Sequence, residues 1–187
     1  MDSYDLMQRD GLPEALRVLR DAYPREVWEG HENFGQLVRF WMERHMMFRE
    51  LIGKMGEEAE AFLDRKMPVE TYAPHLSRYG GFFLQQLHGH HQIEDMHYFP
   101  QLVGLDSRID GGFEMLEADH QPIDGLLRRF AEGANGVLGK AEDEAAAYEA
   151  AGAFREELNS MGQLLERHLT DEEDLVVPVI LKSGFDG

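Results

Sequence analysis

The sequence contains no cysteine, and this absence narrows the chemistry that the chain can perform. Disulfide bonds, thiolate zinc sites, cysteine-ligated iron–sulfur clusters and cysteine nucleophiles are all excluded. A metal ion would therefore be bound by imidazole and carboxylate groups, which suit iron, manganese or zinc.

Positive charge and long apolar stretches are also scarce. The chain has 18 Lys and Arg residues against 36 Asp and Glu residues, which gives a formal net charge of −18. A field of that sign repels phosphate backbones and anionic membranes, so we expect no nucleic-acid partner and no membrane partner. No apolar run approaches the roughly 18 residues that span a bilayer, and the first residues, MDSYDLMQRD, lack the features of a secretory signal. We therefore expect a cytoplasmic protein.

The sequence does contain long helical patterns that are separated by proline and glycine. A short helix is predicted between Pro13 and Pro24. Four long helices are predicted over about residues 33–66, about residues 71–98, from Gly112 onward, and from AEDEAAAYEAAG to Val177-Pro178. The prediction is an all-α fold, in which residues 33–187 form an antiparallel up-down-up-down four-helix bundle and residues 1–32 form a short N-terminal helical extension.

Each long helix carries an apolar stripe at i, i+3, i+4 spacing, and a histidine interrupts each stripe. These histidines are His45, His90, His120 and His168. Because chain direction alternates in such a bundle, all four fall roughly 15 Å from the same end. The sequence therefore predicts that they converge on one buried site.

One motif occurs twice, on the second and the fourth long helix. Both copies have a histidine and a glutamate four residues apart with a proline six residues further on: His90, Glu94 and Pro100, then His168, Glu172 and Pro178. Side chains at i and i+4 lie one turn apart on the same helix face, so both can bind a single ion. A buried carboxylate costs several kcal/mol unless a cation compensates its charge. The motif therefore predicts a metal site, and we expect each proline to end its helix.

These motifs resemble the hemerythrin-like (HHE cation-binding) domains over about residues 36–181. The resemblance rests on a histidine in the first helix, HxxxE and then FP in the second, a histidine in the third and HxxxE in the fourth. It implies a non-haem di-iron centre, with two iron ions joined by an oxo or hydroxo bridge. The implied ligands are His45, His90, Glu94, His120, His168 and Glu172. The implied function is binding or sensing of oxygen, nitric oxide or iron itself, and an enzymatic activity is not favoured.

The sequence departs from the oxygen-carrying hemerythrins at two points. It pairs His120 with Asp124 where those proteins have a second histidine, and their spacing of the last carboxylate would select Glu173. The pattern is more similar to that of the family's iron-responsive and regulatory members. His91 could be a fifth nitrogen ligand or a hydrogen-bond donor outside the ligand set. The sequence does not decide whether Asp124 or Glu173 also binds metal.

Two other functions compete with this interpretation. A ferritin-like di-iron carboxylate oxidoreductase, or an iron-storage protein, would use Glu-x-x-His pairs. Such pairs occur at Glu94 with His97 and at Glu117 with His120, but they leave two core histidines unexplained. In the third possibility a metal-free bundle contacts other proteins through its acidic surface. Residues 1–32 could cap the bundle or form a homodimer contact.

Overall fold

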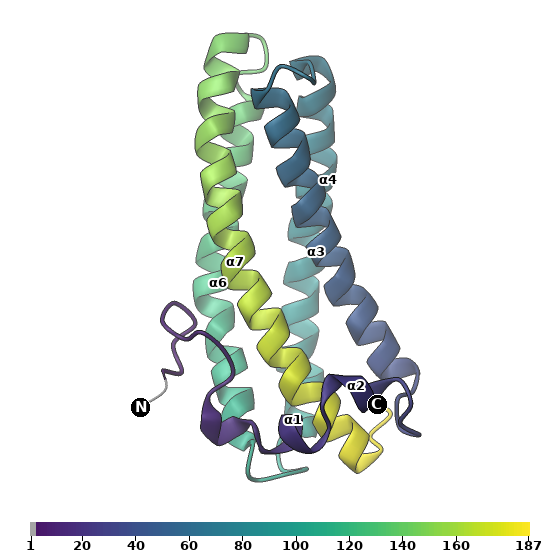
Figure 1. The fold of residues 1–187 in the computed structure, drawn as a ribbon. Coiled ribbons are helices and arrows are strands. Elements are labelled where there is room, and N and C mark those ends of the chain that lie inside the picture. The colour runs from purple at the N-terminus through teal and green to yellow at the C-terminus, as the bar shows by residue number, and fades with distance from the viewer. Residues whose placement is uncertain (1–2) are drawn as a thin grey trace. The chain divides into compact units, whose positions relative to one another are not determined.

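The computed structural model describes residues 3–187. Its long helices are α3 (Gln36–Leu63), α4 (Val69–Ile93), α6 (Asp110–Leu138) and α7 (Glu144–Ser183). The shorter helices are η1 (Glu14–Leu16), α1 (Val18–Ala22), α2 (Arg25–Trp28), η2 (Glu94–Tyr98) and α5 (Phe99–Leu102) (Figure 1). The described residues contain no strand, so the predicted all-α class is confirmed as a helical bundle. Among them, none of the helices has the length and apolar character needed to cross a membrane.

The chain forms two compact units, and each contains a part of all four long helices. Unit 1 comprises the chain up to Met46, together with His90–Pro122 and Leu164–Gly187. Unit 2 comprises Met47–Gly89 and Ile123–Gln163.

Unit 2 is built around aromatic side chains. Phe48 of α3 and Phe83 of α4 have ring centroids 6.3 Å apart. The same row continues from Phe83 to Phe130 of α6 at 5.6 Å and on to Phe154 of α7 at 5.3 Å. All four rings are buried, so one apolar core connects the four helices within this unit.

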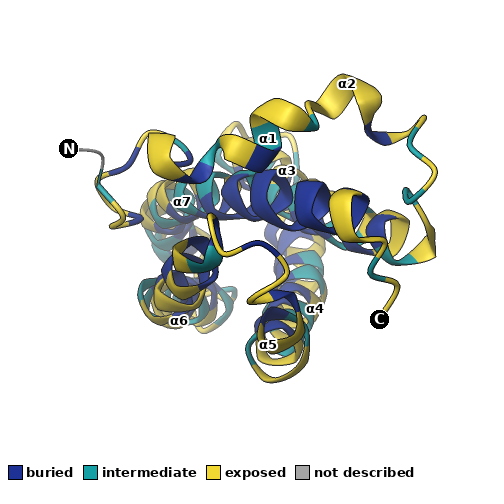
Figure 2. Ribbon diagram, turned by 90° about the horizontal axis from the view of Figure 1, so that it is seen from below, coloured by how far each residue is buried: buried dark blue, intermediate teal, exposed yellow. Residues whose placement is uncertain are grey.

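Unit 1 has an apolar core of its own, to which residues N-terminal to α3 contribute. Leu12, Leu16 and Trp28 are buried there together with side chains of α3, α5, α6 and α7. The segment that holds α1 and α2 runs beside the C-terminal part of α7 (Figure 1). Every residue of α7 from Asp171 to Leu181 is buried, which an amphipathic helix on a surface would not show (Figure 2).

The prediction that Pro100 and Pro178 end their helices is wrong. α7 passes through Pro178 and ends at Ser183. The chain also stays helical through Pro100 and ends its helix at Leu102. Proline fits the first turn of a helix, and Pro100 occupies such a position in α5.

The turn before Pro100 is a π-helix, η2, rather than an α-helix. The backbone N–H of Phe99 donates to the carbonyl O of Glu94, five residues earlier. A proline ring clashes with the carbonyl four residues before it in a regular α-helix, and a wider turn relieves that clash. The π-helix therefore explains how the helix continues, and it carries Glu94 of the predicted metal site.

Candidate metal centre

Histidine and glutamate side chains from all four long helices meet inside unit 1. All six residues of the predicted ligand set are brought together, and His91 joins them. The ligand atoms form two groups in which all atoms lie within 4.8 Å of one another: His91, Glu94, His120 and His168 in group A, and His45, His90, Glu94 and Glu172 in group B. Every one of these residues is buried except His90, whose side chain is 9% exposed.

The two glutamates lie between histidines of the two groups. Glu94 Oε1 is 2.6 Å from His90 Nε2, and its Oε2 is 3.6 Å from His120 Nε2. Glu172 Oε1 is 3.3 Å from His45 Nε2, and its Oε2 is 3.7 Å from His168 Nε2. Each carboxylate thus has one oxygen near a histidine of each group.

Several of these atoms are buried without a hydrogen-bond partner among the described residues. They are both ring nitrogens of His91, Nε2 of His120 and His168, and Oε2 of Glu172. A buried polar atom without a partner costs about 1–3 kcal/mol, and more when it is charged. A cation held among these nitrogen and oxygen atoms would compensate for that cost, so the donor set fits a site for iron, manganese or zinc.

In three of the histidines, the ring nitrogen Nδ1 lies beside a carboxylate outside the two groups. The Nδ1 atoms lie 2.8–3.0 Å from a carboxylate oxygen: His45 from Glu173, His120 from Asp95 and His168 from Asp119. A carboxylate in this position accepts the Nδ1–H and so orients the ring with Nε2 toward the site; Nε2 has its lone pair available when the imidazole is neutral.

These supporting carboxylates were missed by the sequence analysis or left open. The spacing of residues in the sequence could not predict the role of Asp119. It is next to His120 in the chain, but the histidine that it contacts is His168 on another helix. Glu173 contacts His45 Nδ1 and is in neither group, whereas Asp124 is exposed.

Burial sets the charge of most of the histidines. It lowers the pKa of His90 to about 3, and it is also the main cause of the lowered pKa values of His91 and His120. These imidazoles are therefore neutral at pH 7, which is the form that binds metal ions.

His45 and the glutamates behave differently. Burial opposes the charged form of His45, but the carboxylates of Glu172 and Glu173 outweigh it and raise its pKa to about 9. Although burial also opposes ionisation of Glu172, the nearby His45 holds its pKa below the ordinary value. Burial, together with the charge of Glu172, raises the pKa of Glu94. Two carboxylates this close favour one shared proton or a cation between them.

The remaining histidines lie outside both groups. His88 and His97 are exposed, and so is Glu117, which the ferritin-like alternative requires. His31 Nδ1 accepts a hydrogen bond from the backbone N–H of Asn33 before α3. In unit 2, His75 Nδ1 lies 3.0 Å from Glu58 Oε1.

An all-helical chain with buried histidines and glutamates from four helices has the features of a metal-binding helical bundle. The family model described as the hemerythrin HHE cation-binding domain matches residues 36–180, and the chain belongs to this family. The resemblance seen in the sequence is therefore confirmed. Comparisons with curated proteins and with solved structures found no match. Family membership and the buried groups together indicate that unit 1 could hold a metal ion.

Proposed function

We propose that the protein binds two iron ions in unit 1 and uses them to bind or sense oxygen, nitric oxide or iron, without catalytic turnover. The observation that carries the proposal is the pair of buried ligand groups that share Glu94. One tetrahedral ion uses only four ligands, whereas the two groups contain five histidines and two glutamates.

The assignment of ligands follows the two groups. His91, Glu94, His120 and His168 would hold one ion, and His45, His90, Glu94 and Glu172 would hold the other. His91 is thereby added to the set implied by the sequence, because both of its ring nitrogens are buried without a partner among the described residues. An iron pair would supply a centre that changes oxidation state and takes up a small diatomic ligand.

The balance of ligands favours binding over oxygen cleavage. Five imidazoles and two carboxylates give a less electron-rich site than a carboxylate-rich set would. The ferritin-like alternative needs His97 and Glu117 inside the bundle, and both are exposed. We also propose the up-down-up-down topology for the long helices, since it would explain why four histidines so far apart in the sequence come together.

The test is anaerobic reconstitution of the purified full chain with Fe(II), followed by measurement of iron per chain. We expect about two ions, because the donor set exceeds that of one ion. His45→Ala and His168→Ala should each lose at least one iron, whereas the exposed His97→Ala should keep both. Circular dichroism checks that all three variants remain helical. Uptake of one zinc and no iron would overturn the di-iron proposal, and loss of iron only in His97→Ala would favour the ferritin-like site.

A further inference from the structure

The N-terminal segment, defined here as residues 4–28, contributes two arginines to the surroundings of the candidate metal centre. Arg9 and Arg25 precede the family match, which begins at residue 36. The carboxylates to which these arginines donate hydrogen bonds are outside the predicted ligand set. Each arginine contacts a carboxylate that holds a ligand histidine.

Arg9 is buried beside the carboxylate that holds His168. Its Nη1 donates to Asp119 Oδ1 at 2.8 Å, and its Nη2 donates to Asp119 Oδ2. Asp119 Oδ2 is also the atom that lies 3.0 Å from His168 Nδ1. The Nε of Arg9 donates to Asp171 Oδ2 at 2.7 Å, and the arginine side chain is only 1% exposed. Its guanidinium therefore bridges α6 and α7 behind group A.

Arg25 occupies the corresponding position behind group B. Its Nη1 donates to Glu173 Oε2 at 2.9 Å, and the other oxygen of that carboxylate lies 3.0 Å from His45 Nδ1. Its Nε donates to Asp174 Oδ1 at 3.0 Å. The Arg25 side chain is 42% exposed and lies over the ring of Trp28.

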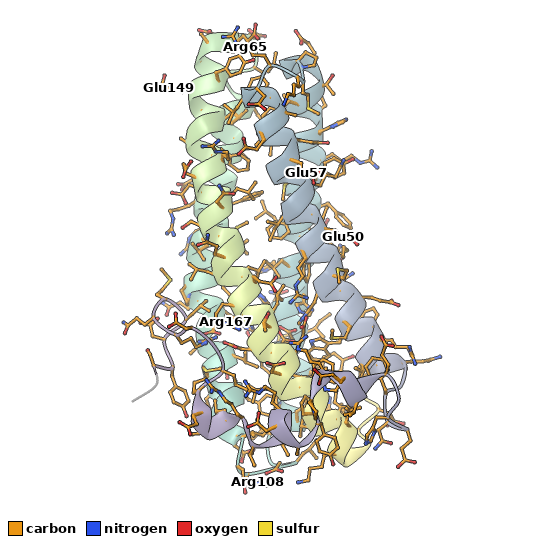
Figure 3. The ribbon with its side chains drawn as sticks, in the orientation of Figure 1. Glu50, Glu57, Arg65, Arg108, Glu149 and Arg167 are labelled. Atoms are coloured by element: carbon orange, nitrogen blue, oxygen red, sulfur yellow. The ribbon has the colours of Figure 1, made fainter. Side chains whose placement is uncertain are left out.

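A third arginine fixes the segment from the other side. Arg167 extends from α7 toward the segment, where its Nη1 donates to the carbonyl O of Asp10 (Figure 3). Its Nη2 lies 3.1 Å from Asp171 Oδ1, so Asp171 is shared between Arg167 and Arg9. The segment is thus attached to α7 directly beside the residues that carry the site.

We propose that Arg9 and Arg25 are positioning residues for the metal centre, each holding the carboxylate that orients one histidine, so that docking of the N-terminal segment and metal binding stabilise each other. This inference rests on the proposed metal-binding function. It adds that the centre is completed by a part of the chain outside the family match.

The physical reason is the charge of the supporting carboxylates. A buried carboxylate that loses a charged hydrogen-bond donor is destabilised, and it will turn toward another partner or toward water. The Nδ1–H of the histidine then loses its acceptor, and Nε2 is no longer held toward the metal. Loss of such a supporting group typically weakens metal binding about 10–100-fold. By thermodynamic reciprocity, bound metal must stabilise the docked segment by the same factor.

The experiment is anaerobic titration of the full chain with Fe(II), and with Co(II) for its ligand-sensitive visible spectrum. The variants are Arg9→Gln and Arg25→Gln. The matched control is Arg20→Gln, from the same segment, whose guanidinium pairs with the neighbouring Asp21. We expect Arg9→Gln to weaken one ion about 10–100-fold and to change the Co(II) bands of that ion. Arg25→Gln should weaken the other ion by less, because Arg25 is partly exposed, and Arg20→Gln should bind as wild type.

A second measurement follows the segment itself. Proteinase K cleavage within residues 4–28 should be slower in the metal-loaded wild type than in the metal-free wild type. Arg9→Gln should reduce that protection, and Arg9→Lys, which keeps the cation, should restore a part of it. A purely structural role of Arg9 would speed cleavage equally with and without metal.

The outcomes separate this inference from the proposed function. A wild type that binds no metal overturns both. A wild type that binds two ions, together with Arg9→Gln and Arg25→Gln variants that bind them equally well, overturns only the role of the segment. If Arg9→Gln does not fold, Arg25→Gln decides, because its partly exposed side chain can be replaced with less disturbance of the core.

Discussion

Trp41 is a residue whose role depends on a single donor atom. Its Nε1–H donates to Glu172 Oε1, and the indole packs edge-on against His90 and Tyr98. Trp41→Phe keeps most of the ring packing and removes the donor. In metal-free protein we expect the free energy of unfolding to fall by about 1.5–3 kcal/mol, the range for a hydrogen bond to a charged group. Urea denaturation measures this change.

The matched control for this variant is Trp28→Phe. The Nε1–H of Trp28 donates to the neutral carbonyl O of Tyr23, and the side chain is buried in the same unit. A neutral hydrogen bond contributes about 0.5–1.5 kcal/mol, so this variant should lose less stability. A larger loss at Trp28 than at Trp41 would contradict the assigned role of the indole N–H.

Asp106 gives a prediction for the effect of pH. Hydrogen bonds from Arg108 and from Lys182 of α7 hold the pKa of this carboxyl well below its ordinary value. A carboxyl with a lowered folded pKa stabilises the protein above its unfolded pKa of about 3.9, and the contribution is lost as the pH falls below that value. Asp106→Asn should therefore lower the free energy of unfolding by about 1–2 kcal/mol at pH 7.

The same variant should differ less from wild type in acid. We expect the difference in unfolding free energy to shrink as the pH falls below about 4, because the unfolded wild-type chain then binds a proton at Asp106 while the folded protein, with its lowered pKa, does not. Asp124→Asn, at an exposed carboxyl, is the control and should differ little from wild type at any pH. A difference at Asp106 that is constant from pH 7 to pH 3 would contradict the charge-based explanation.

The residues that the sequence revealed are those that break a pattern. Two histidine–glutamate pairs interrupt apolar stripes and repeat one spacing, namely His90 with Glu94 and His168 with Glu172. Helix periodicity alone places the two members of each pair on the same face of their helix. Asp119 gave no such signal, because aspartate on a helix is ordinarily solvated and its partners are distant in the chain. Contacts of this kind depend on tertiary packing, which periodicity does not encode.

At the scale of helices, the close approach of α6 and α7 in unit 1 depends on Gly112. A Cβ at Gly112 would lie 2.8 and 2.9 Å from two methyl carbons of Leu175, which is buried. Alanine has a higher helix propensity than glycine by up to about 1 kcal/mol, whereas overpacking a core costs about 1–3 kcal/mol. We expect Gly112→Ala to lower the melting temperature, because the leucine branch cannot move within the core without displacing its neighbours.

The adjacent glycine provides the control. Gly111 is exposed, and a Cβ there would have no described atom within 4 Å apart from its chain neighbours and the backbone of its own helix. Gly111→Ala should leave the melting temperature unchanged or raise it slightly. Equal effects of the two substitutions would mean that the α6–α7 approach is looser than this packing requires.

Helix existence was predictable, but the effect of proline on the helices was not. The apolar stripes predicted α3, α4, α6 and α7 near their observed bounds, because long periodic segments leave few alternatives. Pro100 and Pro178 were expected to end their helices, and both lie inside helical structure. The sequence indicates only the free-energy cost of placing a proline inside a helix. In α7 the burial of residues 171–181 stabilises the helix enough for it to continue past Pro178. At Pro100 the π-helix absorbs the misfit.

At the scale of the whole chain, polar burial is distributed unequally between the two units. Among the described residues, every buried charged side chain and buried histidine lies in unit 1, with the exception of Glu58. Unit 2 is held by a continuous row of phenylalanines. Apolar burial stabilises a fold by itself, whereas a buried charge destabilises it unless an opposite charge lies nearby. The stability of unit 1 should therefore depend on whether a cation balances the charge of its buried carboxylates.

Removal of metal should therefore destabilise the protein strongly. With free metal at 100 times the dissociation constant, each bound ion contributes about 2.7 kcal/mol, so two ions would contribute about 5 kcal/mol. For a chain of this size, 1 kcal/mol shifts the melting temperature by about 2–4 °C, and chelation should lower it by roughly 10–20 °C. Thermal unfolding followed by circular dichroism, with and without anaerobic Fe(II), measures the shift, and readdition of metal should restore it. Equal melting temperatures in the two states would favour a metal-free bundle, because an ion that binds the folded protein must raise its melting temperature.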